Sequence, residues 1–257
     1  MGKIMAVHSY KGGTGKTLLS INLAAALAKT SKKVCLFDFD FRAPSLATLL
    51  KVKSPNCWLN DYLNGSCEIE KALVDISERV GNSGKLCVAL ANPNTEAIRE
   101  MSSKDRKWEM RALGRLLALR NLISDVGSFD YLVFDTSPGL QYSSINAIVA
   151  ADLVVVATTF DRSDMDGTQR MLRELYDLFE KKTYLVLNKV LESPSRHKND
   201  LQATVKDFYQ VPLLGVVPCY CDILKAEGST IFAQDKPDHP FTRMLNALAA
   251  DIEKSIG

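Results

Sequence analysis

The segment YKGGTGKT, residues 10–17, has the residue types and the spacing of a phosphate-binding loop. Its glycines would let the backbone curl so that successive N–H groups point at phosphate oxygens. Lys16 would reach the β- and γ-phosphates of a nucleotide, and the hydroxyl of Thr17 would hold Mg²⁺. We therefore expect phosphate binding by Gly12, Gly13, Thr14, Gly15, Lys16, Thr17 and Leu18.

Two residues depart from the general loop pattern G-x-x-x-x-G-K-[ST]. Tyr10 stands where the first glycine is expected, and Lys11 adds a cation that the pattern does not require. A simple glycine turn with a solvated lysine is the alternative. The apolar run before the loop and the apolar-striped helix after it favour phosphate binding, since a helix N-terminus attracts anions. The residues alone leave the effect of Tyr10 open.

Carboxylates follow two other apolar runs of the sequence. Asp38 and Asp40 end the run VCLFDFD, and alternate residues of a strand share a face, so both could approach the loop. Asp135 ends the run YLVFD, where a carboxylate can hold a Mg²⁺-bound water opposite a phosphate loop. The alternative is structural, with Asp38 and Asp40 capping the turn that follows them.

Two later apolar runs suggest a pocket for a nucleotide base. The side-chain amide of Asn188 could bond a purine edge, and Pro218 ends the next run. The sequence continues as NKVLE and lacks the aspartate of a guanine-specific site, which favours ATP over GTP. An ordinary loop at both places is the alternative.

The elements that must position these residues alternate along the chain. Predicted strands lie at 4–7, 34–40, 86–91, 131–135, 153–159, 183–188 and 212–218, and predicted helices at 16–30, about 107–126, 142–150, 165–181, 198–209 and 240–256. The alternation predicts a doubly wound α/β fold with a mainly parallel sheet flanked by helices, in which ligands bind at the carboxyl ends of the strands. We expect an irregular stretch at 53–71 and a single domain over residues 1–257.

The composition is that of an ordinary soluble protein. Among 257 residues, 46% are apolar and 24% are charged, and the net charge of +2 creates no strong field toward nucleic acid or a membrane. The N-terminus is not a signal peptide, and no apolar run reaches the length of about 18 residues that spans a membrane. We therefore expect a cytoplasmic protein whose six cysteines are free thiols.

The loop KGGTGKT resembles the deviant Walker A signature K-G-G-x-G-K-[ST] of the ParA/MinD family of P-loop ATPases, and further motifs follow in family order to about residue 225. The resemblance implies a P-loop NTPase fold that uses ATP and Mg²⁺. It also implies a homodimer in the ATP-bound state, in which Lys11 reaches the phosphates of the partner subunit. Lys11 and Lys16 would then be catalytic residues, as would Asp40 by positioning the attacking water.

Further roles rest on the same resemblance. Asp38 and Asp135 would join Thr17 around Mg²⁺, the carboxylates through water, and DTSPG would be a switch segment in which Gly139 responds to the γ-phosphate. The region of Asn188 and Pro218 would hold adenine. Slow hydrolysis would return the dimer to monomers, so the protein would be a dimerisation switch for spatial positioning, cell division or partitioning, with an unidentified protein partner.

A second function class stays open because of Cys219 and Cys221. Two thiolates at that spacing can bind a soft metal, and a two-fold dimer would bring four together. The protein would then be a nucleotide-held scaffold or a metal- or cluster-insertion chaperone with little turnover. The pair follows the expected base-pocket proline, with no histidine or third cysteine close in sequence, which favours small loop residues.

Two amphipathic segments could indicate what kind of partner the protein binds. Residues 99–120 hold seven basic and three acidic side chains, so one face could contact DNA phosphates or an acidic protein, although a solvated face is favoured. Its other side is predicted to be core, with Trp108, Leu113, Leu116, Leu117 and Leu119. The apolar stripe of residues 241–256 is predicted to pack on the sheet and not to bind a membrane.

Overall fold

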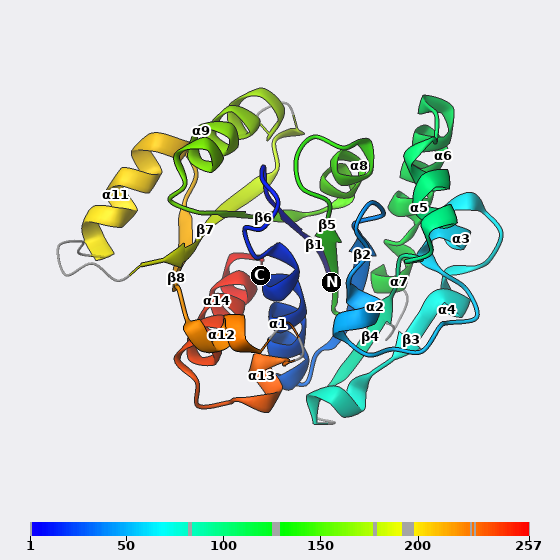
Figure 1. The fold of residues 1–257 in the computed structure, drawn as a ribbon, viewed down its shortest axis with the longest axis horizontal. Coiled ribbons are helices and arrows are strands. Elements are labelled where there is room, and N and C mark those ends of the chain that lie inside the picture. The colour runs from blue at the N-terminus through cyan, green and yellow to red at the C-terminus, as the bar shows by residue number, and fades with distance from the viewer. Residues whose placement is uncertain are drawn as a thin grey trace.

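An eight-stranded sheet forms the centre of the protein in a computed structural model (Figure 1), which describes residues 2–81, 84–124, 129–176, 179–191, 198–226, 228 and 230–256. The strand order is β3-β4-β2-β5-β1-β6-β7-β8. The strands are β1 (Lys3–His8), β2 (Lys33–Phe39), β3 (Leu73–Asp75), β4 (Lys85–Ala89), β5 (Tyr131–Thr136), β6 (Leu153–Thr158), β7 (Lys182–Val190) and β8 (Leu213–Pro218).

All neighbouring strands are parallel except β3, which pairs antiparallel with β4. The seven predicted strands and the doubly wound α/β fold are confirmed. The sequence did not predict β3, which has three residues and no buried side chain.

The helices are α1 (Lys16–Lys29), α2 (Leu46–Leu49), α3 (Leu59–Asn64), α4 (Ile69–Ala72), η1 (Ser77–Val80), α5 (Thr95–Ser102), α6 (Arg106–Ala118), α7 (Asn121–Ser124), α8 (Tyr142–Ala150), α9 (Arg162–Met171), η2 (Leu172–Tyr176), α11 (Lys198–Tyr209), α12 (Cys221–Lys225), α13 (Phe232–Asp235) and α14 (Pro240–Ile256). The predicted helices at 142–150, 198–209 and 240–256 have these bounds.

Two predicted helices have different bounds in the structure. The helix expected at 107–126 ends at Ala118 and is followed by the short α7, and residues 125–126 lie outside the described residues. The helix expected at 165–181 begins at Arg162, because Asp161 caps it by accepting a hydrogen bond from the backbone of Asp164. It continues from Leu172 as the π-helical turn η2.

Residues 53–71 are not irregular throughout, since they contain α3 and the start of α4. Gly65 ends α3 with φ +83°, and the reversal brings Cys67 back to Cys57, with which it forms a disulfide. The expectation of six free thiols is therefore wrong for this pair. The remaining four cysteines are free: Cys35 and Cys87 are buried, and Cys219 and Cys221 are exposed.

Helices cover both faces of the sheet. On one face α8 and α9 pack over the strands, with α6 against α8, and on the other α1 lies beside α14 (Figure 1). The predicted apolar stripe of α14 is buried through Phe241, Leu245, Leu248 and Ile252, which confirms its packing on this side of the sheet. In the described part of the chain, no helix combines the length and the apolar character needed to cross a membrane.

The basic segment 99–120 contains the end of α5 and the whole of α6, with a break between the two helices. Trp108, Leu116 and Leu119 are buried as predicted, but Leu117 is 44% exposed, so its assignment to the core was wrong. Leu117 therefore lies on an exposed face of α6. The carboxylate of Asp105 begins α6 by accepting a hydrogen bond from the backbone N–H of Trp108 at 2.8 Å.

Candidate nucleotide-binding site

The glycine loop joins β1 to α1 at the carboxyl edge of the sheet. Gly13 and Gly15 have φ values of +80° and +94°, in the left-handed region that favours glycine. Gly15 is the residue at the N-terminal cap of α1 and has no side chain to satisfy the first backbone N–H groups of the helix. These N–H groups and the helix dipole make the loop suited to an anion.

The side chain of Lys16 is directed into this site and is only 6% exposed. Burial lowers the pKa of its ammonium group, while the nearby carboxylates of Asp135, Asp40 and Asp164 act in the opposite direction. The structure thus brings Lys16 close to two of the three aspartates that the sequence singled out. A cation held in a low-dielectric position interacts strongly with an added phosphate.

Asp135 is a buried carboxylate at the end of β5. Its Oδ1 accepts a hydrogen bond from the hydroxyl of Ser20 at 2.9 Å, and the hydroxyl of Thr17 also bonds to it. Burial is the main cause that raises the pKa of Asp135 to about 6. Among the described residues, Asp135 Oδ2 has no hydrogen-bond partner, nor does the buried Thr14 Oγ1 in the loop.

Asp38 lies directly opposite Asp135, in the neighbouring strand β2. It is completely buried, and burial together with the charge of Asp135 raises its pKa well above the usual value. Its two oxygens accept hydrogen bonds from the backbone N–H groups of Asp40 and Leu46 at 3.1 and 3.4 Å. Carboxylate and hydroxyl oxygens are the ligands that Mg²⁺ prefers, so Asp38, Asp135 and Thr17 fit the ion.

Asp40 follows the end of β2 and is half-buried. One of its oxygens accepts hydrogen bonds from the hydroxyl of Ser137 at 3.0 Å and from the backbone of Ala43 at 3.1 Å. The capping role considered for Asp38 and Asp40 is therefore present. Asp40 additionally contacts the DTSPG segment, which contains Ser137.

His8, the last residue of β1, was not predicted to belong to the site. Its ring Nδ1 lies 2.6 Å from the hydroxyl oxygen of Thr136, at the end of β5, and both side chains are buried. Burial and the charge of Lys16 lower the pKa of His8 to about 3, so the ring is neutral. His8 thus connects the strand before the loop to the start of DTSPG.

Asn188 and Lys189, near the end of β7, donate side-chain hydrogen bonds to the backbone of the loop. The amide of Asn188 donates a hydrogen bond to the carbonyl of Thr14 at 2.6 Å, and the ammonium of Lys189 donates to the carbonyl of Gly13 at 2.7 Å. The contact of Asn188 with a purine edge stays a prediction. Pro218 lies at the end of β8, the strand next to β7.

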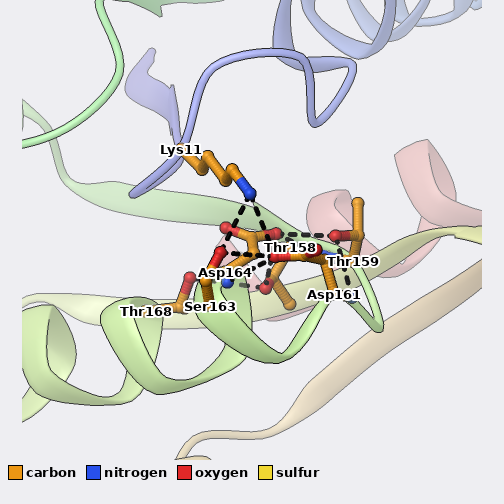
Figure 2. A network of polar contacts seen from close by, with 7 residues as sticks. All are labelled: Lys11, Thr158, Thr159, Asp161, Ser163, Asp164 and Thr168. Carbon is orange, nitrogen blue, oxygen red and sulfur yellow. Dashed lines mark hydrogen bonds and ion pairs between the residues drawn. The ribbon is translucent and has the colours of Figure 1, made fainter.

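A cavity of about 660 Å³ opens between the loop, the start of α9 and the end of β7. This volume is in the range of small-molecule pockets, roughly 300–1,000 Å³. At its edge, the ammonium of Lys11 lies 3.0 Å from Asp161 and 2.9 Å from the hydroxyl of Ser163 (Figure 2). Lys11 therefore contacts its own chain.

Tyr10 lies against α9. A Cβ atom built on Gly167 would overlap the Tyr10 ring, so the ring occupies space that only a glycine in α9 leaves open. Neither Asp161 nor Gly167 was predicted to belong to the site.

Cys219 and Cys221 follow β8 and are exposed. Within the described ranges, no group of three or more His, Cys, Asp or Glu side chains could hold a metal ion. The structure thus brings no third protein ligand to this pair among those residues.

The mainly parallel sheet, the glycine loop between β1 and α1, and the carboxylates at the ends of β2 and β5 define a P-loop NTPase. A family model described as an AAA domain matches residues 2–192. The septum site-determining protein MinD of Synechocystis sp. is 31% identical over 222 residues, which are 85% of this chain and 76% of that protein.

Two solved structures of MinD proteins cover almost the whole chain. The cell division ATPase MinD of Pyrococcus furiosus is 26% identical, with a TM-score of 0.77 over 99% of this chain and 100% of that chain. MinD of Pyrococcus horikoshii in complex with Mg-ADP is 24% identical, with a TM-score of 0.78 over 100% and 98%, and shows the likeness of fold alone. The chain belongs to the ParA/MinD family of P-loop ATPases.

Proposed function

We propose that this protein binds ATP with Mg²⁺ at the glycine loop and hydrolyses ATP slowly, as a switch between a monomer and a homodimer. The observation that carries the proposal is the buried ammonium of Lys16 beside Asp40 and Asp135, at a loop whose glycines adopt left-handed backbone conformations. The family of P-loop ATPases to which the chain belongs supports the choice of ATP, and the oxygen ligands offered by Asp38, Asp135 and Thr17 support the choice of Mg²⁺.

Each residue of the site has a chemical role in this proposal. Backbone N–H groups of the loop and the ammonium of Lys16 bind the β- and γ-phosphates. The Thr17 hydroxyl would hold Mg²⁺ directly and Asp38 and Asp135 would hold it through water, and the ion would neutralise charge on the phosphate oxygens. Asp40 orients the attacking water.

The DTSPG segment connects hydrolysis to the shape of the protein. Gly139 has φ +76°, and its N–H donates a hydrogen bond to the carbonyl of Ser9, at the end of β1, at 2.9 Å. Ser137 bonds to Asp40. A γ-phosphate between the loop and this segment would therefore alter contacts on both sides of the site.

In the ATP-bound dimer, Lys11 reaches the phosphates of the partner subunit and acts as a cation supplied in trans. Residues 1–257 function as one domain in the cytoplasm. The dimer and the monomer differ in affinity for a protein partner, and the two states thereby serve positioning, cell division or partitioning.

The test is the solution mass of the Asp40→Ala variant by light scattering, with Mg-ATP and separately with Mg-ADP. We expect a dimer with Mg-ATP alone, and a monomer again when Lys11→Ala is added. Lys53→Ala, an exposed lysine on residues before α3, is the matched control and should leave the dimer unchanged. A monomer with both nucleotides would contradict the switch.

A further inference from the structure

The amino group of Lys11 is bound to the start of α9 in its own chain (Figure 2). The hydroxyl of Ser163 accepts from Lys11 at 2.9 Å and donates to Asp161 Oδ1 at 2.6 Å, while Lys11 also contacts that oxygen at 3.0 Å. The three side chains thus form a closed set of contacts. The ammonium has both an anionic and a neutral oxygen as acceptors.

The acceptor group is fixed in place by the fold of α9. Asp161 Oδ1 also accepts from the backbone N–H of Asp164 at 3.0 Å and so caps the helix. Asp164 is completely buried and accepts hydrogen bonds from Thr159, from its backbone at 2.7 Å and its hydroxyl at 2.9 Å. The Asp161 carboxylate, which accepts the hydrogen bond from Lys11, therefore has a defined position in the nucleotide-free protein.

The backbone beside Lys11 is attached to the same helix. The ring of Tyr10 lies against Gly167, within α9. Two successive residues, Tyr10 and Lys11, consequently contact α9 at different places. The Lys11 side chain can therefore release Asp161 without a movement of the backbone. The contact of Tyr10 with Gly167 keeps the start of the loop in position.

The charge of the acceptor persists at neutral pH. The hydroxyl of Ser163, and after it Lys11, lower the pKa of Asp161 to about 2. The side chains of Lys11 and Asp161 are 49% and 54% exposed, and ion pairs with such exposure are weak and screened by salt. A triphosphate, with more charge than one carboxylate, can therefore compete for the ammonium.

We propose that Asp161 and Ser163 are positioning residues that form a cis clasp for Lys11 and withhold its amine from phosphates outside its own chain. The proposal rests on the proposed function in one respect, which is that the partner's phosphates are the target of the released amine. A symmetric dimer opens two clasps, one in each protomer, so the effect of one clasp on the dimer constant is squared.

The first experiment measures the clasp in the nucleotide-free protein. Asp161→Asn removes the charge and keeps a good helix cap. Acylation of the Lys11 amine with an N-hydroxysuccinimide ester, followed by peptide mass spectrometry, should be faster in this variant by about two- to five-fold, the range of an exposed ion pair.

The matched control for this labelling is Asp166→Asn. Asp166 is a second carboxylate of α9 and faces Arg162 at 3.9 Å. The control should leave Lys11 labelling unchanged, and Ser163→Ala should raise it by less than Asp161→Asn. Equal labelling rates in the parent and Asp161→Asn would overturn the clasp.

The second experiment measures its consequence in the Asp40→Ala background with Mg-ATP. Sedimentation at a series of protein concentrations should show dimerisation of Asp161→Asn at a lower concentration, with a dissociation constant reduced about four- to twenty-five-fold. Faster labelling with an unchanged dimer constant would overturn the withholding role. Absence of an ATP-dependent dimer in the parent would instead contradict the proposed function, and the labelling result would still decide the clasp.

Discussion

Asp38 and Asp135 lie opposite each other in the neighbouring parallel strands β2 and β5, and both side chains are buried. Burial is the main cause that raises the pKa of each carboxyl, and for Asp38 the charge of Asp135 adds to it. Two adjacent carboxylates therefore carry an electrostatic cost in the nucleotide-free protein. A divalent cation beside them would relieve that cost.

The raised pKa of Asp135 predicts how stability depends on pH. The folded state holds a proton up to about pH 6, while the unfolded state loses it near pH 3.8. The free energy of unfolding of the metal-free protein should therefore fall as the pH rises between these values, by at most about 1.4 kcal/mol per pH unit from this group. Urea unfolding measured at several pH values from 4 to 6 gives this slope. In Asp135→Asn, the part of the slope that comes from the Asp135 carboxyl should be absent.

The control for this prediction is Asp251→Asn, on an exposed part of α14. Its pH dependence should match that of the parent. A slope in Asp135→Asn equal to the parent's slope would contradict the assignment of the titration to Asp135.

His8 should produce a slope of the opposite sign. Its pKa is lowered from 6.5 to about 3 in the folded protein, so the unfolded state alone takes up a proton between these values. Stability should therefore fall as the pH drops below about 6.5, again by at most about 1.4 kcal/mol per unit. In His8→Asn this component disappears, and the unfolding free energy should then decline more steeply as the pH rises from 4 to 6.

The two groups oppose each other in the parent over that range. The double variant His8→Asn with Asp135→Asn should consequently return toward the parent's slope. If the free energy of unfolding of His8→Asn depends on pH in the same way as that of the parent, the prediction is wrong.

Asn188 offers a test between its predicted contact with a base and its observed contact with the loop. The hydrogen bond from its amide to the Thr14 carbonyl supports the phosphate-binding segment. Asn188→Ala should therefore weaken ATP and GTP binding by the same factor, about five- to thirty-fold for one buried hydrogen bond. Calorimetric titration with both nucleotides measures this, with Asn246→Ala on α14 as the control. Weakened binding of ATP alone would favour the purine-edge contact.

Tyr10 and Gly167 should be coupled in stability. A methyl group at position 167 overlaps the Tyr10 ring, so Gly167→Ala should destabilise the parent. In a Tyr10→Ala background the same change should stabilise by about 0.5–1 kcal/mol, because alanine is the better helix former. Urea unfolding of the four proteins in this double-mutant cycle gives the coupling. If Gly167→Ala changes the free energy of unfolding equally in both backgrounds, the Tyr10 ring does not pack against position 167 as described.

The sequence predicted the central sheet well because its strands are buried on both faces and read as continuous apolar runs. The strand β3 and the helices α3 and α4 escaped prediction, since elements of three to six residues show no period long enough to recognise. The Cys57–Cys67 disulfide escaped with them, because it depends on the path of α3.

For the candidate site, the sequence pointed to the loop by its motif and to the three aspartates by the ends of apolar runs and the family resemblance, and the structure brings Asp40 and Asp135 close to Lys16. The contacts of Lys11 with Asp161 and of Tyr10 with Gly167 were not predicted, because they join the loop after β1 to the distant segment that follows β6. His8 gave no signal for the same reason, since its contact with Thr136 exists only when β1 lies beside β5. Leu117 shows a further limit, since the apolar pattern of α6 did not reveal which leucines face outward.

The strand order has a consequence for synthesis of the protein on the ribosome. β1 carries the glycine loop, yet its two neighbours in the sheet are β5 (Tyr131–Thr136) and β6 (Leu153–Thr158). A nascent chain that ends before Leu153 already contains the whole glycine loop. It still lacks β6, one of the two neighbours of β1 in the sheet. Under the proposed function, nucleotide binding would therefore require the later part of the chain, and ATP would selectively stabilise chains whose central strands are all present.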